Sequence, residues 1–133
     1  MEIQGILTLA LVNIPAMLIM VAISFNSYSI SKKHRNQFCL VFLTITMIVA
    51  LELLTFFVNG LDIRWRWVNI VSNYLGFTMI PLVPVFCAGA ISDYRHSKWV
   101  LCLMAGYAIF MLFSVPCHLV YSVTSENMYY RCR

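Results

Sequence analysis

One uninterrupted apolar run, residues 38–58, constrains this chain more than any other feature of its sequence. The run reads FCLVFLTITMIVALELLTFFV and contains a single charged residue, Glu52. Because an α-helix rises about 1.5 Å per residue, a helix of this length crosses the hydrocarbon core of a bilayer, which is about 30 Å thick. The run therefore predicts a membrane-spanning helix that carries one carboxyl group within the membrane.

Three further apolar runs predict three further spans. They cover about residues 3–25, 68–90 and 99–121, and a polar tail, residues 122–133, follows the last of them. Only 11% of the residues are charged and 62% are hydrophobic, whereas about 25% of the residues in a soluble domain are charged. Lipid must therefore cover most of the surface. We predict an all-α fold, a single polytopic membrane domain of residues 1–133 built as a four-transmembrane-helix bundle.

The lysines orient the predicted bundle. Lys32 and Lys33 lie in the loop before the second span, and Lys98 lies in the loop before the fourth. Because lysine and arginine are enriched in the cytoplasmic loops of membrane proteins, these two loops are expected in the cytoplasm. Both termini of a four-span, multi-pass protein are then expected on the extracytoplasmic side of the plasma membrane.

The carboxyl group in the second span needs a polar partner, and the third span offers candidates. Asn69, Ser72 and Asn73 are spaced by three and four residues, so they share one helical face. By helical rise, Glu52 and Asn73 both lie roughly 8–9 Å inside the same membrane edge. Two interpretations stay open: these groups bond to one another and lock two helices together, or they line a polar pocket open to the outside.

Three prolines are predicted hinge points. Pro81 and Pro84 lie in the third span, and Pro116 lies in the fourth. Each proline removes a backbone donor, so a helix must bend or open there.

The sequence contains no recognisable catalytic motif and no metal-ligand pattern. GxSxG, HExxH and glycine-rich phosphate loops are all missing, and the five cysteines form no CxxC pair. We therefore expect no enzyme activity, no cofactor and no metal. The basic residues form short clusters between apolar runs, which argues against a nucleic-acid partner. The remaining partners are the lipid bilayer, an unidentified ligand and, as an open alternative, a second copy of the chain in a homodimer.

Several segments, in this order along the chain, resemble the amino-terminal membrane region of bacterial GGDEF signalling proteins. They read RNQF, LELLTFFVNG, VNIVSNYLGFTMIPLVPVF and SENMYYR. The matching residues are Glu52, Asn59, Gly60, Asn73, Pro81, Pro84, Glu126, Asn127, Tyr130 and Arg131. In that family several membrane helices precede a cytoplasmic diguanylate cyclase domain. The resemblance implies a sensor, or input module, of cyclic-di-GMP signal transduction in a bacterial plasma membrane.

The chain also departs from that family. It contains no GGDEF sequence, and Cys132 and Arg133 follow the tyrosine-arginine pair where the family usually continues through glycine and proline. With both termini outside, the resemblance implies a fragment of such a sensor without its catalytic domain. Two alternatives stay open. One is a small transporter subunit, which broken helices and an intramembrane acid would suit, and the other is an accessory membrane protein without its own ligand.

Overall fold

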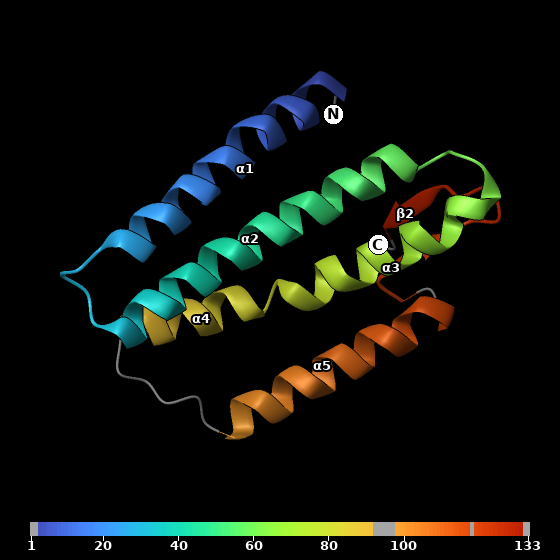
Figure 1. Ribbon diagram of the computed structural model, residues 1–133. Coiled ribbons are helices and arrows are strands. Elements are labelled where there is room, and N and C mark those ends of the chain that lie inside the picture. The colour runs from blue at the N-terminus through green and yellow to red at the C-terminus, as the bar shows by residue number, and fades with distance from the viewer. Residues whose placement is uncertain (1–2, 92–97, 118, 132–133) are drawn as a thin grey trace.

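The computed structural model describes residues 3–91, 98–117 and 119–131, and within them the chain is almost entirely helical (Figure 1). The elements are α1 (Ile3–Asn26), α2 (Lys32–Val58), the 3-10 turn η1 (Ile63–Trp65), α3 (Arg66–Met79), α4 (Leu82–Ile91), α5 (Lys98–Cys117), β1 (Tyr121–Val123) and β2 (Tyr129–Arg131). The predicted helical class is confirmed, with one addition, a small carboxyl-terminal hairpin that was not expected from the sequence.

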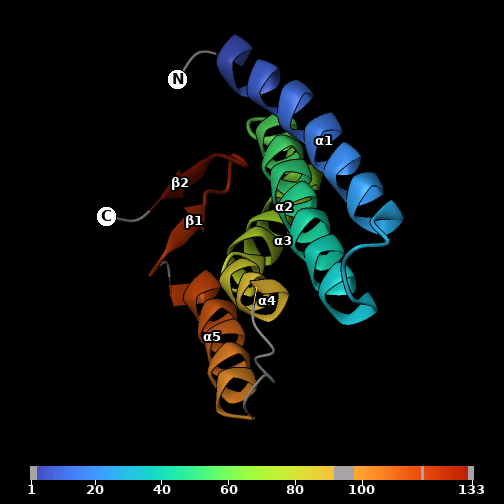
Figure 2. The same ribbon diagram turned by 90° about the vertical axis from the view of Figure 1, so that its left-hand side faces the viewer.

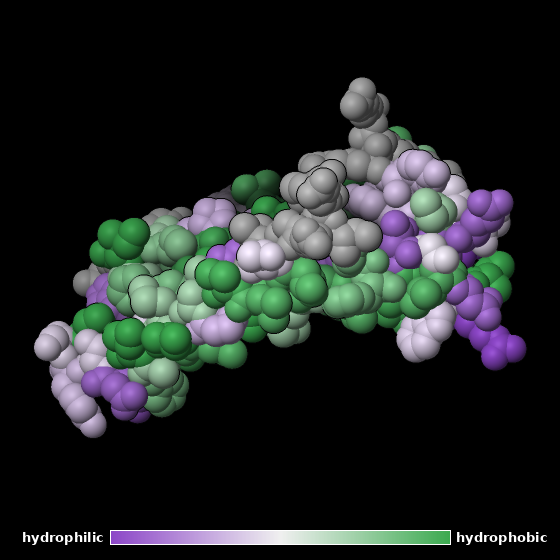
Figure 3. All heavy atoms as spheres, turned by 90° about the horizontal axis from the view of Figure 1, so that it is seen from above, coloured by the Kyte–Doolittle hydropathy of each residue, from purple (hydrophilic) through white to green (hydrophobic). Residues whose placement is uncertain are grey.

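Within the part of the chain that the structure describes, three helical stretches are long and apolar enough to cross a membrane. They are Lys32–Val58, Ile63–Ile91 and Lys98–Cys117. Helix α1 has 24 residues, and its apolar segment Ala10–Asn26 is shorter than these three stretches. Seen from above, hydrophobic residues cover most of the length of the helices, and hydrophilic residues gather mainly at the two ends (Figure 3). This distribution is the one that a lipid-facing helical protein needs.

Helix α2 begins earlier than predicted. The basic segment that was expected in a loop forms the first turns of the helix, because Ser31 caps it: the Ser31 Oγ accepts a hydrogen bond of 3.4 Å from the His34 backbone N–H. The His34 side chain then reaches α4, where its Nδ1 lies 3.0 Å from the Ala90 carbonyl oxygen. A carbonyl oxygen only accepts, so Nδ1 is the donor, and this bond joins the ends of α2 and α4.

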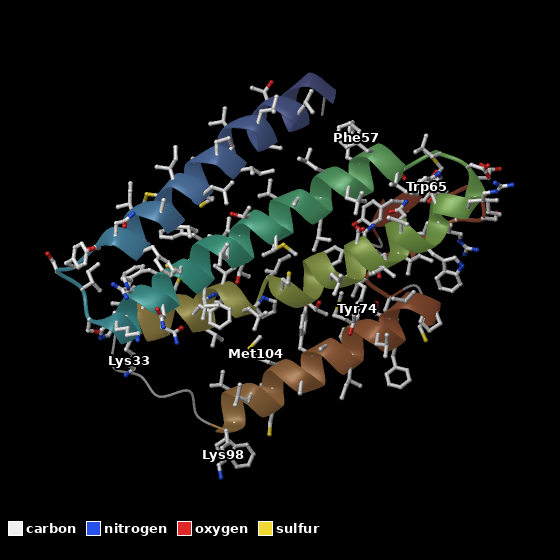
Figure 4. The ribbon with its side chains drawn as sticks, in the orientation of Figure 1. Lys33, Phe57, Trp65, Tyr74, Lys98 and Met104 are labelled. Atoms are coloured by element: carbon white, nitrogen blue, oxygen red, sulfur yellow. The ribbon has the colours of Figure 1, made fainter. Side chains whose placement is uncertain are left out.

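The helices pack side by side in chain order (Figures 1 and 2). Helix α1 packs on α2, and α2 packs on α3 and α4. Helix α5 packs against α3 and β1. Two tyrosines join α5 to α3: the Tyr74 hydroxyl donates to the Ala108 carbonyl at 3.2 Å, and the Tyr107 hydroxyl donates to the Phe77 carbonyl at 3.4 Å. Tyr74 lies between α3 and α5 in Figure 4.

The third span is interrupted where its prolines begin. Helix α3 ends at Met79 and α4 begins at Leu82, so the break falls at Ile80 and Pro81. Pro84 lies in the first turn of α4, where a missing backbone N–H removes no intrahelical hydrogen bond. Pro116 lies in the last turn of α5 and does not interrupt its middle. Only Pro81 thus lies at a break between helices, and hinge motion at the three prolines stays a prediction.

The end of the chain differs from the prediction. Helix α5 ends at Cys117, short of residue 121, and the segment predicted as a polar tail forms an antiparallel hairpin in which Val123 pairs with Tyr129. The turn is closed by the Thr124 backbone N–H, which donates to the Met128 carbonyl at 2.9 Å. Asn127 adopts a left-handed backbone with φ of 59°, a conformation that asparagine tolerates better than most residues.

Candidate functional site

The most buried polar side chains lie around the hairpin. Asn69, Ser114 and Asn127 have 0% exposure, and Ser72 has 3%. The hairpin lies beside the amino-terminal half of α3, close to the connection between α2 and α3 (Figures 1 and 2). Because burying an unpaired amide is costly, the partners of the two asparagines show what holds this end of the molecule together.

Three asparagine side chains form a continuous hydrogen-bonded cluster. Asn73 Nδ2 donates to Asn69 Oδ1 at 2.8 Å, and Asn69 Nδ2 donates to Asn127 Oδ1 at 3.0 Å. Asn127 Nδ2 in turn donates to the carbonyl oxygens of Val58 and Leu61, at 2.7 Å and 3.2 Å. We call Asn69, Asn73 and Asn127 the asparagine cluster. It ties the hairpin both to α3 and to the end of α2.

Two further hydrogen bonds hold the hairpin on the turn that follows α2. The Gly60 backbone N–H donates to the Asn127 carbonyl at 3.0 Å, and the Tyr129 N–H donates to Asn59 Oδ1 at 2.7 Å. Gly60 has φ of 80°, which glycine adopts without strain. The Asn59-Gly60 pair therefore both reverses the chain and receives the hairpin.

The structure separates the predicted polar residues into two groups. Asn69 and Asn73 bond to each other and Ser72 is buried beside them on α3, whereas the Glu52 side chain is exposed on α2. Among the described residues, Glu52 makes no hydrogen bond to this stripe. The polar partner of the α3 asparagines is Asn127 of the hairpin, and not Glu52 as predicted. The sequence signal for it was weak: an asparagine in a polar tail, with no periodicity to relate it to α3.

The other face of the hairpin is apolar and is centred on Tyr121. This side chain is 1% exposed and stacks on Phe77, with ring centroids 5.5 Å apart. Its hydroxyl donates to the Ile70 carbonyl at 3.2 Å. Met111 of α5 is buried in the same cluster. Tyr121 therefore joins the hairpin to both α3 and α5.

Burial raises the pKa of Tyr121 from 10.0 to about 12, and the nearby phenols of Tyr129 and Tyr74 contribute to the rise. The neutral phenol is the form that the folded chain favours. Its contribution to stability is therefore complete below pH 10 and is lost as the pH rises from 10 through about 12. At physiological pH Tyr121 is a neutral hydrogen-bond donor.

A cavity of about 240 Å³ lies where α3, α5 and β1 meet. One charged side chain lines it, that of Arg66, whose Nη2 donates to the Val123 carbonyl at 3.2 Å. The Arg66 Nε is buried and has no hydrogen-bond partner within the described part of the chain. The lining residues are Arg66, Trp67, Ile70, Val115, Pro116, Tyr121 and Val123. The cavity is thus largely apolar with a guanidinium group in its wall.

The described asparagines at this end of the molecule form hydrogen bonds, and Arg66 adds one positive charge beside them. Over residues 3–91, 98–117 and 119–131, no three histidine, cysteine, aspartate or glutamate side chains gather as metal ligands would. The asparagine cluster positions the hairpin, and the cavity lies between the hairpin, α3 and α5.

No protein-family model matches this chain. Searches among curated proteins and among solved structures likewise found no match.

Proposed function

We propose that this chain is the membrane-embedded input module of a cyclic-di-GMP signalling protein of the diguanylate cyclase family. The observation that carries the proposal is the contact between two of the segments on which the resemblance rests. Asn127 of SENMYYR bonds to the Val58 carbonyl and to Gly60, both in LELLTFFVNG. If this contact builds the sensing end of the module, both segments are expected in every protein that carries the module, although they lie far apart in the sequence.

The packing supports a route by which such an end would act. Helix α5 packs against α3 and against β1, so a change in the hairpin alters one of the surfaces that hold α5. Helix α3 is separated from α4 at Pro81, where bending breaks few further hydrogen bonds. A ligand at this end shifts the module only if it binds one arrangement of these helices better than another.

We also propose the membrane orientation: four spans, including α1, with both termini outside. Lys33 and Lys98 lie at one end of the molecule, and Trp65 lies at the other (Figure 4). Lysines favour the cytoplasmic side, and tryptophans favour the membrane–water boundary. Trp65 and Trp67 are 50% and 74% exposed, as residues at that boundary would be. The hairpin and the cavity would then face the extracytoplasmic side.

Single cysteines on a cysteine-free background test this orientation. Ser29→Cys lies between α1 and α2, and Ser125→Cys lies in the hairpin turn; both positions are exposed. In intact cells, a membrane-impermeant thiol reagent is expected to label Ser125→Cys and to leave Ser29→Cys unlabelled until the cells are opened. Labelling of Ser29→Cys alone in intact cells would reverse the orientation, and labelling of both would contradict the four-span arrangement.

The signalling role is tested in a protein that joins residue 133, through one further membrane-spanning helix, to a GGDEF domain, so that the cyclase lies in the cytoplasm. The natural joining sequence is sought in the DNA that follows codon 133. A GGDEF-coding frame is expected there. In the joined protein, Asn127→Ala is expected to change the cellular level of cyclic-di-GMP severalfold, because it frees the hairpin from α2 and α3. Ser125→Ala in the same exposed turn is the matched control, and Glu52→Gln tests the intramembrane carboxyl. Output that Asn127→Ala leaves at the control level would refute the role of the hairpin.

A further inference from the structure

We propose that the cavity beside Arg66 binds the anionic group of an amphiphile, a carboxylate or phosphate monoanion attached to an apolar chain. The physiological role of this binding rests on the proposed function, since it names the class of signal that the outer end would receive. The binding itself follows from the side chains around the cavity.

The Arg66 guanidinium has more donors than partners. Arginine carries five N–H donors in a planar fork. One of them, on Nη2, bonds to the Val123 carbonyl. The Nε has no partner among the described residues but is itself buried, so the remaining Nη donors are the ones left for a ligand. No described carboxylate forms an ion pair with this side chain. A partly buried cation without a counter-ion is costly, and the planar fork matches a carboxylate or phosphate better than any other ligand group.

The rest of the cavity requires an apolar ligand body. Ile70, Val115 and Val123 supply aliphatic wall, and the Tyr121 ring supplies aromatic wall. The Tyr121 hydroxyl already donates to the Ile70 carbonyl, so it adds no free donor toward a ligand. A small polar anion such as phosphate alone would leave this surface unfilled, and a neutral alkyl chain would leave the guanidinium unpaired.

Size and position narrow the ligand further. About 240 Å³ is below the range of about 300–1,000 Å³ that encloses a drug-sized molecule, so the cavity takes one end of an amphiphile and leaves the rest of its chain outside. Arg66 and Trp67 form the start of α3, and the positive end of a helix dipole also favours an anion. With the orientation proposed above, the head would lie at the outer membrane boundary and the chain in lipid.

Two sources could supply this chemistry, a free fatty acid and an anionic phospholipid of the bilayer. The purified chain in nanodiscs of neutral phosphatidylcholine is titrated with decanoate and, in parallel, with decanol. Fluorescence of Trp67, which lines the cavity, reports binding, and Trp67→Phe identifies its share of the signal. Decanoate is expected to give a saturable change that decanol does not give. Equal responses to the two would overturn the proposal.

Arg66→Gln is expected to raise the Kd for decanoate about tenfold or more, because it removes the charged partner of the carboxylate. Arg64→Gln is the matched control, because Arg64 is exposed on the neighbouring turn and does not line the cavity; its Kd is expected to stay within about twofold. If the glutamine variant fails to fold, Arg66→Lys replaces it. This variant keeps the positive charge, so its preference for decanoate over decanol is expected to persist. Unchanged affinity in Arg66→Gln would refute the site.

The two sources are separated by repeating the titration in nanodiscs that contain phosphatidylglycerol. If phosphatidylglycerol competes for the cavity, the apparent Kd for decanoate rises in the native chain but not in Arg66→Gln, and the natural ligand is a phospholipid head. An unchanged Kd in the native chain assigns the cavity to a free acid. The proposed function can fail independently: selective binding without any effect on cyclase output retains the site and refutes the signalling role. Conversely, if Asn127→Ala changes the cyclase output but the chain shows no preference for decanoate over decanol, the signalling role is retained and the anion site is refuted.

Discussion

Replacing Asn127 with alanine is expected to detach the hairpin from the helices and to lower the free energy of unfolding by about 2–4 kcal/mol. The Asn127 amide is fully buried and bonds to Asn69 and to the carbonyls of Val58 and Leu61. The truncation removes these bonds and leaves buried groups unpaired, which costs more than the loss of an exposed hydrogen bond. Its left-handed backbone adds strain for alanine but not for glycine.

Two measurements separate these effects. Denaturant unfolding in detergent micelles gives the change in stability, and hydrogen exchange at the Gly60 amide, which donates to Asn127, reports the hairpin contact. Asn127→Gly removes the side chain without the backbone strain, and Ser125→Ala is the control in the same turn. A Gly60 amide that stays as protected in Asn127→Ala as in the native chain would show that the asparagine cluster does not hold the hairpin.

Replacing Tyr121 with alanine is expected to cost about 3–5 kcal/mol, as truncation of a buried aromatic side chain does. Tyr121 is among the largest fully buried side chains in the described part of the chain, and its ring packs between Phe77 and Tyr129. The loss falls on the contacts among β1, α3 and α5 together. We therefore expect α5 to loosen as well as the hairpin.

Tyr121→Phe is the matched control for that prediction. It keeps the ring and loses only the hydrogen bond to the Ile70 carbonyl, so a cost of about 1 kcal/mol is expected. It should also remove the tyrosinate absorbance that appears near pH 12 and not near pH 10 in the native chain. Equal losses of unfolding free energy in the alanine and phenylalanine variants would show that packing of the ring contributes little. Titration of Tyr121 at the same pH as the exposed tyrosines would show that it is not buried.

Local features of the sequence predicted the parts of the fold that depend on neighbours along the chain. The apolar run of residues 38–58 forms a helix, which is the form that a segment crossing lipid must take, because its backbone polar groups could there be satisfied only within the helix. Pro81 interrupts the third span for an equally local reason, the missing N–H and the ring that clashes with the preceding turn. The turn after α2 also has a local cause, because Gly60 adopts a positive φ without strain.

The carboxyl-terminal hairpin could not be predicted in this way. Its strands have three residues each, too few for a period of two to be recognised. Its stability comes from Asn127 and Tyr121, whose partners lie on α2, α3 and α5. An asparagine in a polar segment carries no sign of whether it is solvated or fully buried.

Only part of the placement of Glu52 could be predicted from the sequence. Helical rise gave its depth in the membrane and matched it to Asn73, but depth does not decide the direction in which a side chain points. Packing of α2 against α3 and α4 turns Val41, Thr44 and Val58 inward and leaves Glu52 exposed. The sequence alone determined that the chain forms apolar helices and how far along each one its residues lie. The rotation of each helix about its axis and the pairing of distant amides depend on tertiary packing, because they require side chains to fit together across the whole molecule.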